Sequence, residues 1–117
     1  MSELRFRVPV GADDVTGVLH LPDDSLPGPC VIACHGMGAS KDSDKYLQVG
    51  RELPAAGLAL ARFDFRGSGE SAGLPRDATI ESRIADLEAV LAHLATGPEL
   101  DGRFGLLGSS LGGYVAL

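Results

Sequence analysis

The chain has 117 residues, enough for one domain of ordinary size, and we expect residues 1–117 to form a single unit. Hydrophobic residues make up 44% of it and glycine occurs 16 times, a composition typical of a folded protein and not of a disordered one. The formal net charge of -6 argues against a nucleic-acid backbone or an anionic membrane surface as partner.

The N-terminus, MSELRFRVPV, has neither the apolar core nor the small-residue cleavage site of a signal peptide. No apolar run approaches the roughly 18 to 20 residues that cross a bilayer. We therefore expect a cytoplasmic protein without a membrane partner.

Two short strands are predicted first. Residues 4–10, LRFRVPV, alternate apolar with polar side chains, as half-buried strands do. Residues 15–21, VTGVLHL, form a second strand after turn residues. The segment PDDSLPGP that follows is rich in proline and is predicted to be a loop.

Three later runs are almost continuously apolar or small: CVIAC at 30–34, LALARFDF at 58–65 and FGLLG at 104–108. Such runs suit strands that are covered on both faces, as in a parallel sheet flanked by helices. Cys30 and Cys34 are too far apart along one extended strand for a disulfide, so both are predicted to be buried, unpaired thiols.

A first helix is predicted over residues 43–57, with Tyr46, Val49 and Leu53 on one face and with Pro54 ending or kinking it late. A second helix is predicted over residues 79–97. Thr79 can cap its start and Gly97 its end, and His93 falls on its polar face. Its apolar positions repeat at helical spacing: Ile80, Ile84, Leu87, Leu91 and Leu94.

Strands and helices alternate from residue 30 onward, which predicts parallel pairing through right-handed crossovers. The fold class is therefore α/β, with the antiparallel N-terminal hairpin at one edge of the sheet. Ligand sites of such sheets form beyond the carboxyl ends of the strands. Three glycine-rich segments stand at those ends: HGMG, DFRGSGES and GSSLGG.

The segment GSSLG fits the pattern G-x-S-x-G with Ser110 at its centre, between Gly108 and Gly112. Strand, sharp turn and helix around this pattern describe a nucleophile elbow, which exposes a serine hydroxyl at the tip of the sheet. Ser109 does not fit, because Leu107 stands where the pattern needs glycine. Ser110 is the predicted nucleophile.

HGMG supplies a second element of the same chemistry. Cleavage of an ester or amide passes through an oxyanion, which needs two preorganised donors. The backbone N–H groups of Met37 and Leu111 are the predicted pair, and Gly36 and Gly38 let the loop approach closely. For His35 we favour a role in bracing this loop over a role as the base.

Together these segments resemble the α/β-hydrolase superfamily, in its serine-aminopeptidase-like, acylglycerol-lipase-like and feruloyl-esterase-like branches. HGMG looks like the oxyanion loop, RFDFRGSGES like the strand-four motif D-x-R-G-x-G-x-S, and GSSLGG like the nucleophile elbow. The resemblance implies Ser110 as nucleophile with Met37 and Leu111 as donors. It also implies that Asp64 and Arg66 brace the rim loops.

The chain departs from that family in its length. Members have about 250 residues, and their triad runs in the order Ser, Asp or Glu, then His. Only LGGYVAL follows Ser110, without acid or base. We therefore expect a partial domain, cut after the elbow, which is inactive alone and is completed by a C-terminal segment. We also expect the strand at 104–108 to be an exposed edge.

The function predicted from these motifs is that of a serine hydrolase that acts on small esters or amides without cofactor or metal, and the sequence leaves two alternatives to it. GSGESA matches a dinucleotide-binding pattern, but Gly73 and Pro75 interrupt the helix that should begin there. A non-catalytic α/β binding or pairing module is a second alternative. KDSDK at 41–45 resembles the start of a calcium loop without its glycine and is predicted to be a solvated loop.

Overall fold

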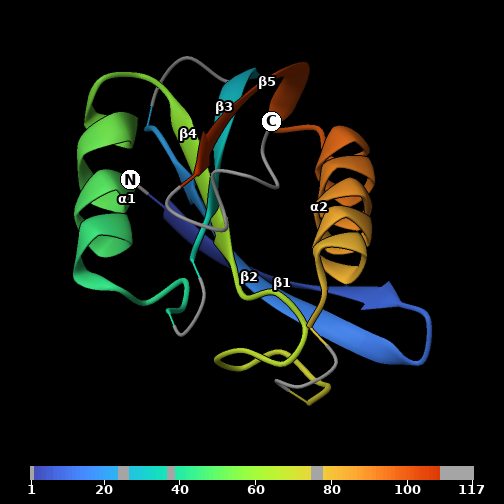
Figure 1. The fold of residues 1–117 in the computed structure, drawn as a ribbon. Helices are drawn as coiled ribbons and strands as arrows, with labels where there is room; N and C mark the ends of the chain where they lie inside the picture. The colour runs from blue at the N-terminus through green and yellow to red at the C-terminus, as the bar shows by residue number, and fades with distance from the viewer. Residues whose placement is uncertain (1, 24–26, 37–38, 75–77, 109–117) are drawn as a thin grey trace.

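The computed structural model describes residues 2–23, 27–36, 39–74 and 78–108. These residues form a five-stranded sheet with one helix on each face (Figure 1). The elements in chain order are β1 (Ser2–Val10), β2 (Asp13–Leu21), β3 (Gly28–Cys34), α1 (Asp44–Ala55), β4 (Ala59–Phe63), α2 (Ile80–Ala95) and β5 (Leu100–Gly108).

The strand order across the sheet is β1-β2-β4-β3-β5. The hairpin β1-β2 is antiparallel and lies at one edge, while β3 pairs in parallel with β4 on one side and β5 on the other. β2 joins the two parts through an antiparallel pairing with β4. The predicted α/β class, the parallel pairing and the edge position of the hairpin are confirmed.

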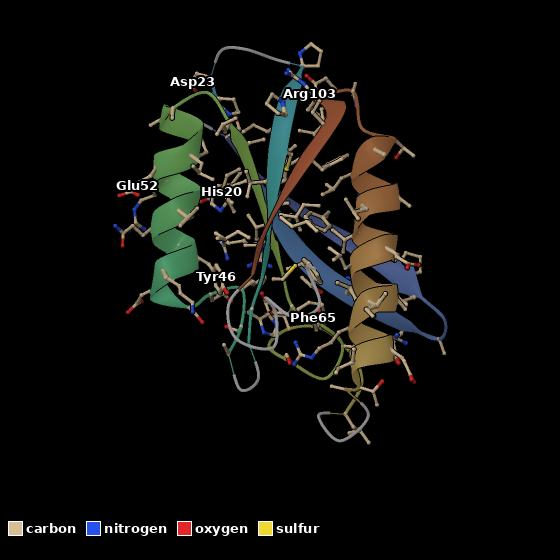
Figure 2. The ribbon with its side chains drawn as sticks, turned by 45° about the horizontal axis from the view of Figure 1, so that its top comes forward. His20, Asp23, Tyr46, Glu52, Phe65 and Arg103 are labelled. Atoms are coloured by element: carbon tan, nitrogen blue, oxygen red, sulfur yellow. The ribbon has the colours of Figure 1, made fainter. Side chains whose placement is uncertain are left out.

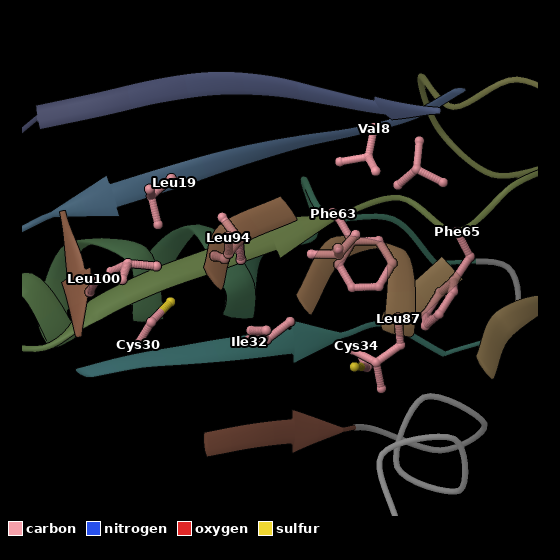
Figure 3. Close-up of a cluster of buried hydrophobic side chains, with 14 of the residues drawn as sticks. Val8, Leu19, Cys30, Ile32, Cys34, Phe63, Phe65, Leu87, Leu94 and Leu100 are labelled. Atoms are coloured by element: carbon pink, nitrogen blue, oxygen red, sulfur yellow. The ribbon is translucent and has the colours of Figure 1, made fainter. Parts of the chain in front are cut away.

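The main hydrophobic core lies between the sheet and α2 (Figure 3). Alternate residues of β2, β3 and β4 point into it, because successive strand side chains face opposite sides of a sheet. Cys30 and Cys34 belong to this core as free cysteines, as predicted. Its buried residues from α2 are Leu87, Val90 and Leu94.

On the other face, α1 packs closely against the sheet. Tyr46 is buried as predicted, and Pro54 lies in the last turn of the helix, which ends at Ala55. Gly50 faces the ring of His20, and a Cβ placed on Gly50 would stand 2.8 Å from His20 Nε2. A glycine is therefore needed for α1 to approach β2 this closely.

The predicted apolar face of α2 is wrong in its first two turns. Ile80 and Ile84 are 41% and 40% exposed, whereas Arg83 and Asp86 are buried. The reason is that this end of α2 lies over the polar loops at the strand ends, not over the apolar part of the sheet. Thr79 caps the helix as predicted, accepting a hydrogen bond from the Ser82 N–H, while Thr96, not Gly97, is the C-cap.

β5 forms the second edge of the sheet within the described part of the chain, as expected. Leu106 and Leu107 are 42% and 40% exposed. Its pairing with β3 is regular from Cys30 to Cys34 and irregular only between Gly28 and Cys30. Gly102, at φ +91°, lies opposite that irregularity and allows the backbone to bulge there.

Candidate active site

The carboxyl ends of the three parallel strands lie in one row. Cys34, the last residue of β3, is paired with Phe63 at the end of β4 and with Gly108 at the end of β5. The segments that begin with His35 and Asp64 therefore start side by side, next to the end of β5. Five predicted site residues fall outside the described part of the chain: Met37, Gly38, Ser110, Leu111 and Gly112.

His35 is completely buried, and both ring nitrogens are engaged. Nε2 accepts a hydrogen bond from the Phe65 N–H at 3.2 Å, so it carries no proton, and Nδ1–H donates to the Gly36 carbonyl at 2.8 Å. Burial lowers the pKa of His35, and the positive charges of Arg83 and Lys41 act in the same direction. The ring is held neutral and has no free nitrogen for proton transfer.

Asp64 links the loop after β3 to the loop after β4. Its carboxylate is fully buried and accepts the Lys41 N–H at 2.7 Å and the Glu70 N–H at 3.0 Å. The Lys41 ammonium lies 3.1 Å from the same carboxylate. One side chain thus fixes the positions of two loops that border the strand ends.

The segment 41–45 was expected to be a solvated loop. Asp42, Asp44 and Lys45 are indeed exposed, but the prediction is wrong for Lys41, a residue that is only 1% exposed. Its ammonium contacts three carboxylates that lie within reach of one another: Asp42, Asp64 and Glu70. Burial by itself would lower the pKa of Lys41, but the hydrogen bonds that its ammonium donates to these carboxylates raise this pKa overall. In the described residues this is the one acidic cluster with the spacing of a metal site, and the lysine already supplies its positive charge.

The glycines and serine of the motif D-x-R-G-x-G-x-S fold the loop around Asp64. Ser71 Oγ donates to the Asp64 carbonyl and accepts the Thr16 N–H at 2.8 Å. Gly69 has φ +49°, and a Cβ at this position would overlap the Asp64 carboxylate. A side chain at Gly69 is therefore excluded both by backbone conformation and by space.

Replacing Gly69 by alanine is expected to lower the free energy of unfolding by about 2 to 4 kcal/mol, since it adds a clash with a buried carboxylate to the strain of a positive φ. The matched control is Gly11→Ala, where φ is +63° and nothing lies within 4 Å. That variant should lose only about 1 kcal/mol. Urea unfolding of both variants measures the difference, and equal losses would contradict the clash.

Arg66 attaches the same loop to α2. Its Nε donates to Asp86 at 2.6 Å and its backbone N–H donates to the other carboxylate oxygen at 2.9 Å. Asp86 is fully buried, and Arg66 both balances the charge of its carboxylate and donates hydrogen bonds to it. Asp86 and Lys41 were not predicted as site residues, although Asp86 interrupts an apolar helical pattern.

A buried polar pair under α1 was also missed. Arg62 Nε donates to His20 Nε2 at 2.9 Å, and an Arg62 terminal nitrogen donates to Asp42 at 2.6 Å. Figure 2 shows His20 between the sheet and α1. Burial lowers the pKa of His20, and the charge of Arg62 lowers it further. The available sequence signal was an arginine inside an otherwise apolar strand.

The third histidine, His93, is exposed on α2, as predicted, and its ring stacks on Phe6 with 5.6 Å between centroids. It lies near the C-terminal end of α2, whereas Asp86 reaches the rim from the first half of that helix.

The dinucleotide alternative is not supported, because α2 begins only at Ile80 and the residues from Gly67 to Gly73 form turns.

A small cavity of about 110 Å³ borders the end of β5. It is lined by residues of α1 and β5, namely Lys45, Tyr46, Val49, Leu107 and Gly108.

No helix in the described residues is both long enough and apolar enough to cross a membrane.

A family model described as serine aminopeptidase, S33, matches residues 26–117. Among curated proteins, the human mitochondrial palmitoyl-protein thioesterase ABHD10 is 32% identical over 76% of this chain. The esterase FrsA of Escherichia fergusonii is 32% identical over the whole chain. The chain spans only 28% and 27% of the lengths of these two relatives.

Solved structures share the fold. Est1E of Butyrivibrio proteoclasticus, with ferulic acid bound, superposes with a TM-score of 0.87 at 22% identity, over 94% of this chain and 44% of that one. The Pyrococcus furiosus esterase Pf2001 has a TM-score of 0.82 at 27% identity, over 98% of this chain and 45% of that one. Because the family model covers most of the residues and the fold agrees, the chain belongs to the serine aminopeptidase (S33) family of α/β hydrolases.

Proposed function

We propose that the protein is a serine hydrolase that cleaves small carboxylic esters or amides through an acyl-enzyme on Ser110. The observation that carries the proposal is that Cys34, Phe63 and Gly108 lie in one row at the ends of their strands. The predicted oxyanion loop follows Cys34 and the predicted nucleophile elbow begins at Gly108, so both start from neighbouring strand ends. The names of the thioesterase and esterase relatives favour esters over amides as substrates.

The hydrogen bond from His35 to Gly36 supports Met37 as an oxyanion donor. Nδ1–H of His35 holds the Gly36 carbonyl at 2.8 Å. In a planar trans peptide the carbonyl and the following N–H point in opposite directions, so we propose that a fixed Gly36 carbonyl also sets the direction of the next N–H. The proposed role of His35 is to orient this donor.

In the proposed reaction the Ser110 hydroxyl attacks the substrate carbonyl and a base takes its proton. The N–H groups of Met37 and Leu111 stabilise the oxyanion, the alcohol or amine leaves, and water releases the acyl group. His20 and His35 are buried and hydrogen-bonded, and His93 stacks on Phe6. We infer that the base and its acid come from residues other than these 117.

A fluorophosphonate probe tests the proposal, because it reacts with serines that a base activates. The full-length protein should be labelled at Ser110, as mapped by peptide mass spectrometry, and Ser110→Ala should abolish labelling. The neighbouring change Ser109→Ala is the matched control and should leave it intact. Labelling at another serine would refute the assignment, and efficient labelling of residues 1–117 alone would refute the missing base.

A further inference from the structure

Arg83 is a buried arginine with little compensation for its charge. It is 2% exposed, and its Nε has no hydrogen-bond partner among the residues that the structure describes. The nearby carboxylate of Asp86 is already bound by Arg66. Burial raises the pKa of the adjacent Cys34 to about 11, so the thiol is neutral near pH 7 and contributes no negative charge.

The contacts of Arg83 converge on His35. One terminal nitrogen donates to the His35 carbonyl at 3.5 Å. The guanidinium also lies over the Phe65 ring, 4.5 Å from its centroid, and the backbone N–H of Phe65 holds His35 Nε2. Arg83 therefore contacts the backbone of His35 directly and its ring through Phe65.

We propose that Arg83 is a positioning residue for the oxyanion loop. It holds His35, His35 holds the Gly36 carbonyl, and this carbonyl belongs to the same peptide as the Met37 N–H. The inference rests on the proposed function and adds to it a residue of α2 that does not touch the substrate.

A purely structural role makes a different prediction from a positioning role. A buried charge without a close ion pair costs stability, and replacing it by an apolar side chain of similar length is often neutral or stabilising. If Arg83 serves packing alone, its removal changes stability and leaves catalysis intact. If it positions the loop, its removal lowers the rate while the fold stays as stable as before.

The test compares Arg83→Met with the unchanged full-length protein, using p-nitrophenyl acetate as substrate. We expect kcat to fall about tenfold to a hundredfold, because a misplaced oxyanion donor weakens transition-state binding. KM should stay within about twofold and Tm should not fall. Arg83→Lys, which keeps the charge but loses the planar stack over Phe65, should be intermediate.

Arg103→Met is the matched control. Arg103 is an exposed arginine of β5 that pairs with Asp101, and it lies at the opposite end of the sheet from Phe65 (Figure 2). This variant should leave kcat unchanged. If it lowers kcat as much as Arg83→Met does, the effect is one of net charge and the inference fails.

The titration of His35, followed by NMR of its ring nitrogens, gives a readout that does not depend on activity. The charged groups facing this ring are Asp64 after β4, Lys41 between β3 and α1, and Arg83 from α2. Arg83 helps to lower the pKa of His35, so Arg83→Met should move the titration to higher pH. An unchanged titration together with kcat within twofold of the original overturns the inference.

The two proposals fail separately. Full activity in Ser110→Ala would remove the proposed function and the inference with it. An inactive Ser110→Ala beside a fully active Arg83→Met would remove only the role of Arg83. If Arg83→Met does not fold, Arg83→Lys decides the matter, since it must fold and still show a lower kcat with an unchanged KM.

Discussion

Replacing Ser110 by alanine in the full-length protein is expected to lower kcat for p-nitrophenyl acetate by about a millionfold, the loss typical of removing a triad nucleophile. The hydroxyl is the proposed attacking group, and no acyl-enzyme forms without it. The absorbance of released p-nitrophenol, followed over time, measures the loss of kcat. KM and Tm should change little, because the substitution removes a single oxygen atom.

The control for Ser110→Ala is the same substitution at Ser109, which should keep activity within about threefold because Ser109 does not fit the nucleophile pattern. The proposed nucleophile is wrong if Ser110→Ala retains a tenth of the original kcat. It is also wrong if the loss follows Ser109 instead.

Replacing Asp64 by alanine is expected to lower the free energy of unfolding by about 3 kcal/mol. The change removes the acceptor for the N–H groups of Lys41 and Glu70 and one of the carboxylates around the buried Lys41 ammonium. Urea unfolding, followed by circular dichroism, measures the loss. Activity should fall as well, since the same carboxylate connects the loops after β3 and β4.

Two comparisons make the Asp64 prediction specific. Asp101→Ala breaks an ion pair with Arg103 on the surface of β5 and should leave the free energy of unfolding almost unchanged. Adding Lys41→Met to Asp64→Ala should recover part of the loss, because the second change removes the charge that the first left short of a partner. An additive double variant would show that the ammonium and this carboxylate are not coupled.

The fold was predictable because strand and helix patterns depend on local sequence. The apolar runs at residues 30–34, 58–65 and 104–108 each supply a strand of the parallel part of the sheet, the second of them through Ala59–Phe63. Their glycine-rich ends then had to lie at one rim, since parallel strands end on the same side.

The buried charges were not predictable in the same way. A helical repeat assumes that the face toward the sheet is apolar, which placed Ile80 and Ile84 inside and left out Arg83 and Asp86. Which charged groups are buried depends on partners far along the chain, such as Arg66 for Asp86 and Glu70 for Lys41. Local periodicity carries no information about such partners.

The groups proposed to react with the substrate are predicted from the sequence alone. Ser110, Leu111 and Met37 lie outside the described residues, whereas the surrounding framework of His35, Asp64 and Arg66 lies inside them. The motif predicted that Asp64 and Arg66 would be polar groups of the rim. It did not indicate that Asp64 would hold two backbone N–H groups of different loops.

The bulge at Gly102 bears on where the sheet can accept changes in sequence. Between the paired positions Gly28–Leu100 and Cys30–Phe104, β5 advances by more residues than β3 does, and the pairing is regular again up to Cys34. The extra residues of β5 are thus accommodated at the end of the sheet remote from the proposed chemistry. Insertions or affinity tags near Gly102 should be tolerated, whereas one inserted residue between Phe104 and Gly108 would turn every following side chain to the opposite face.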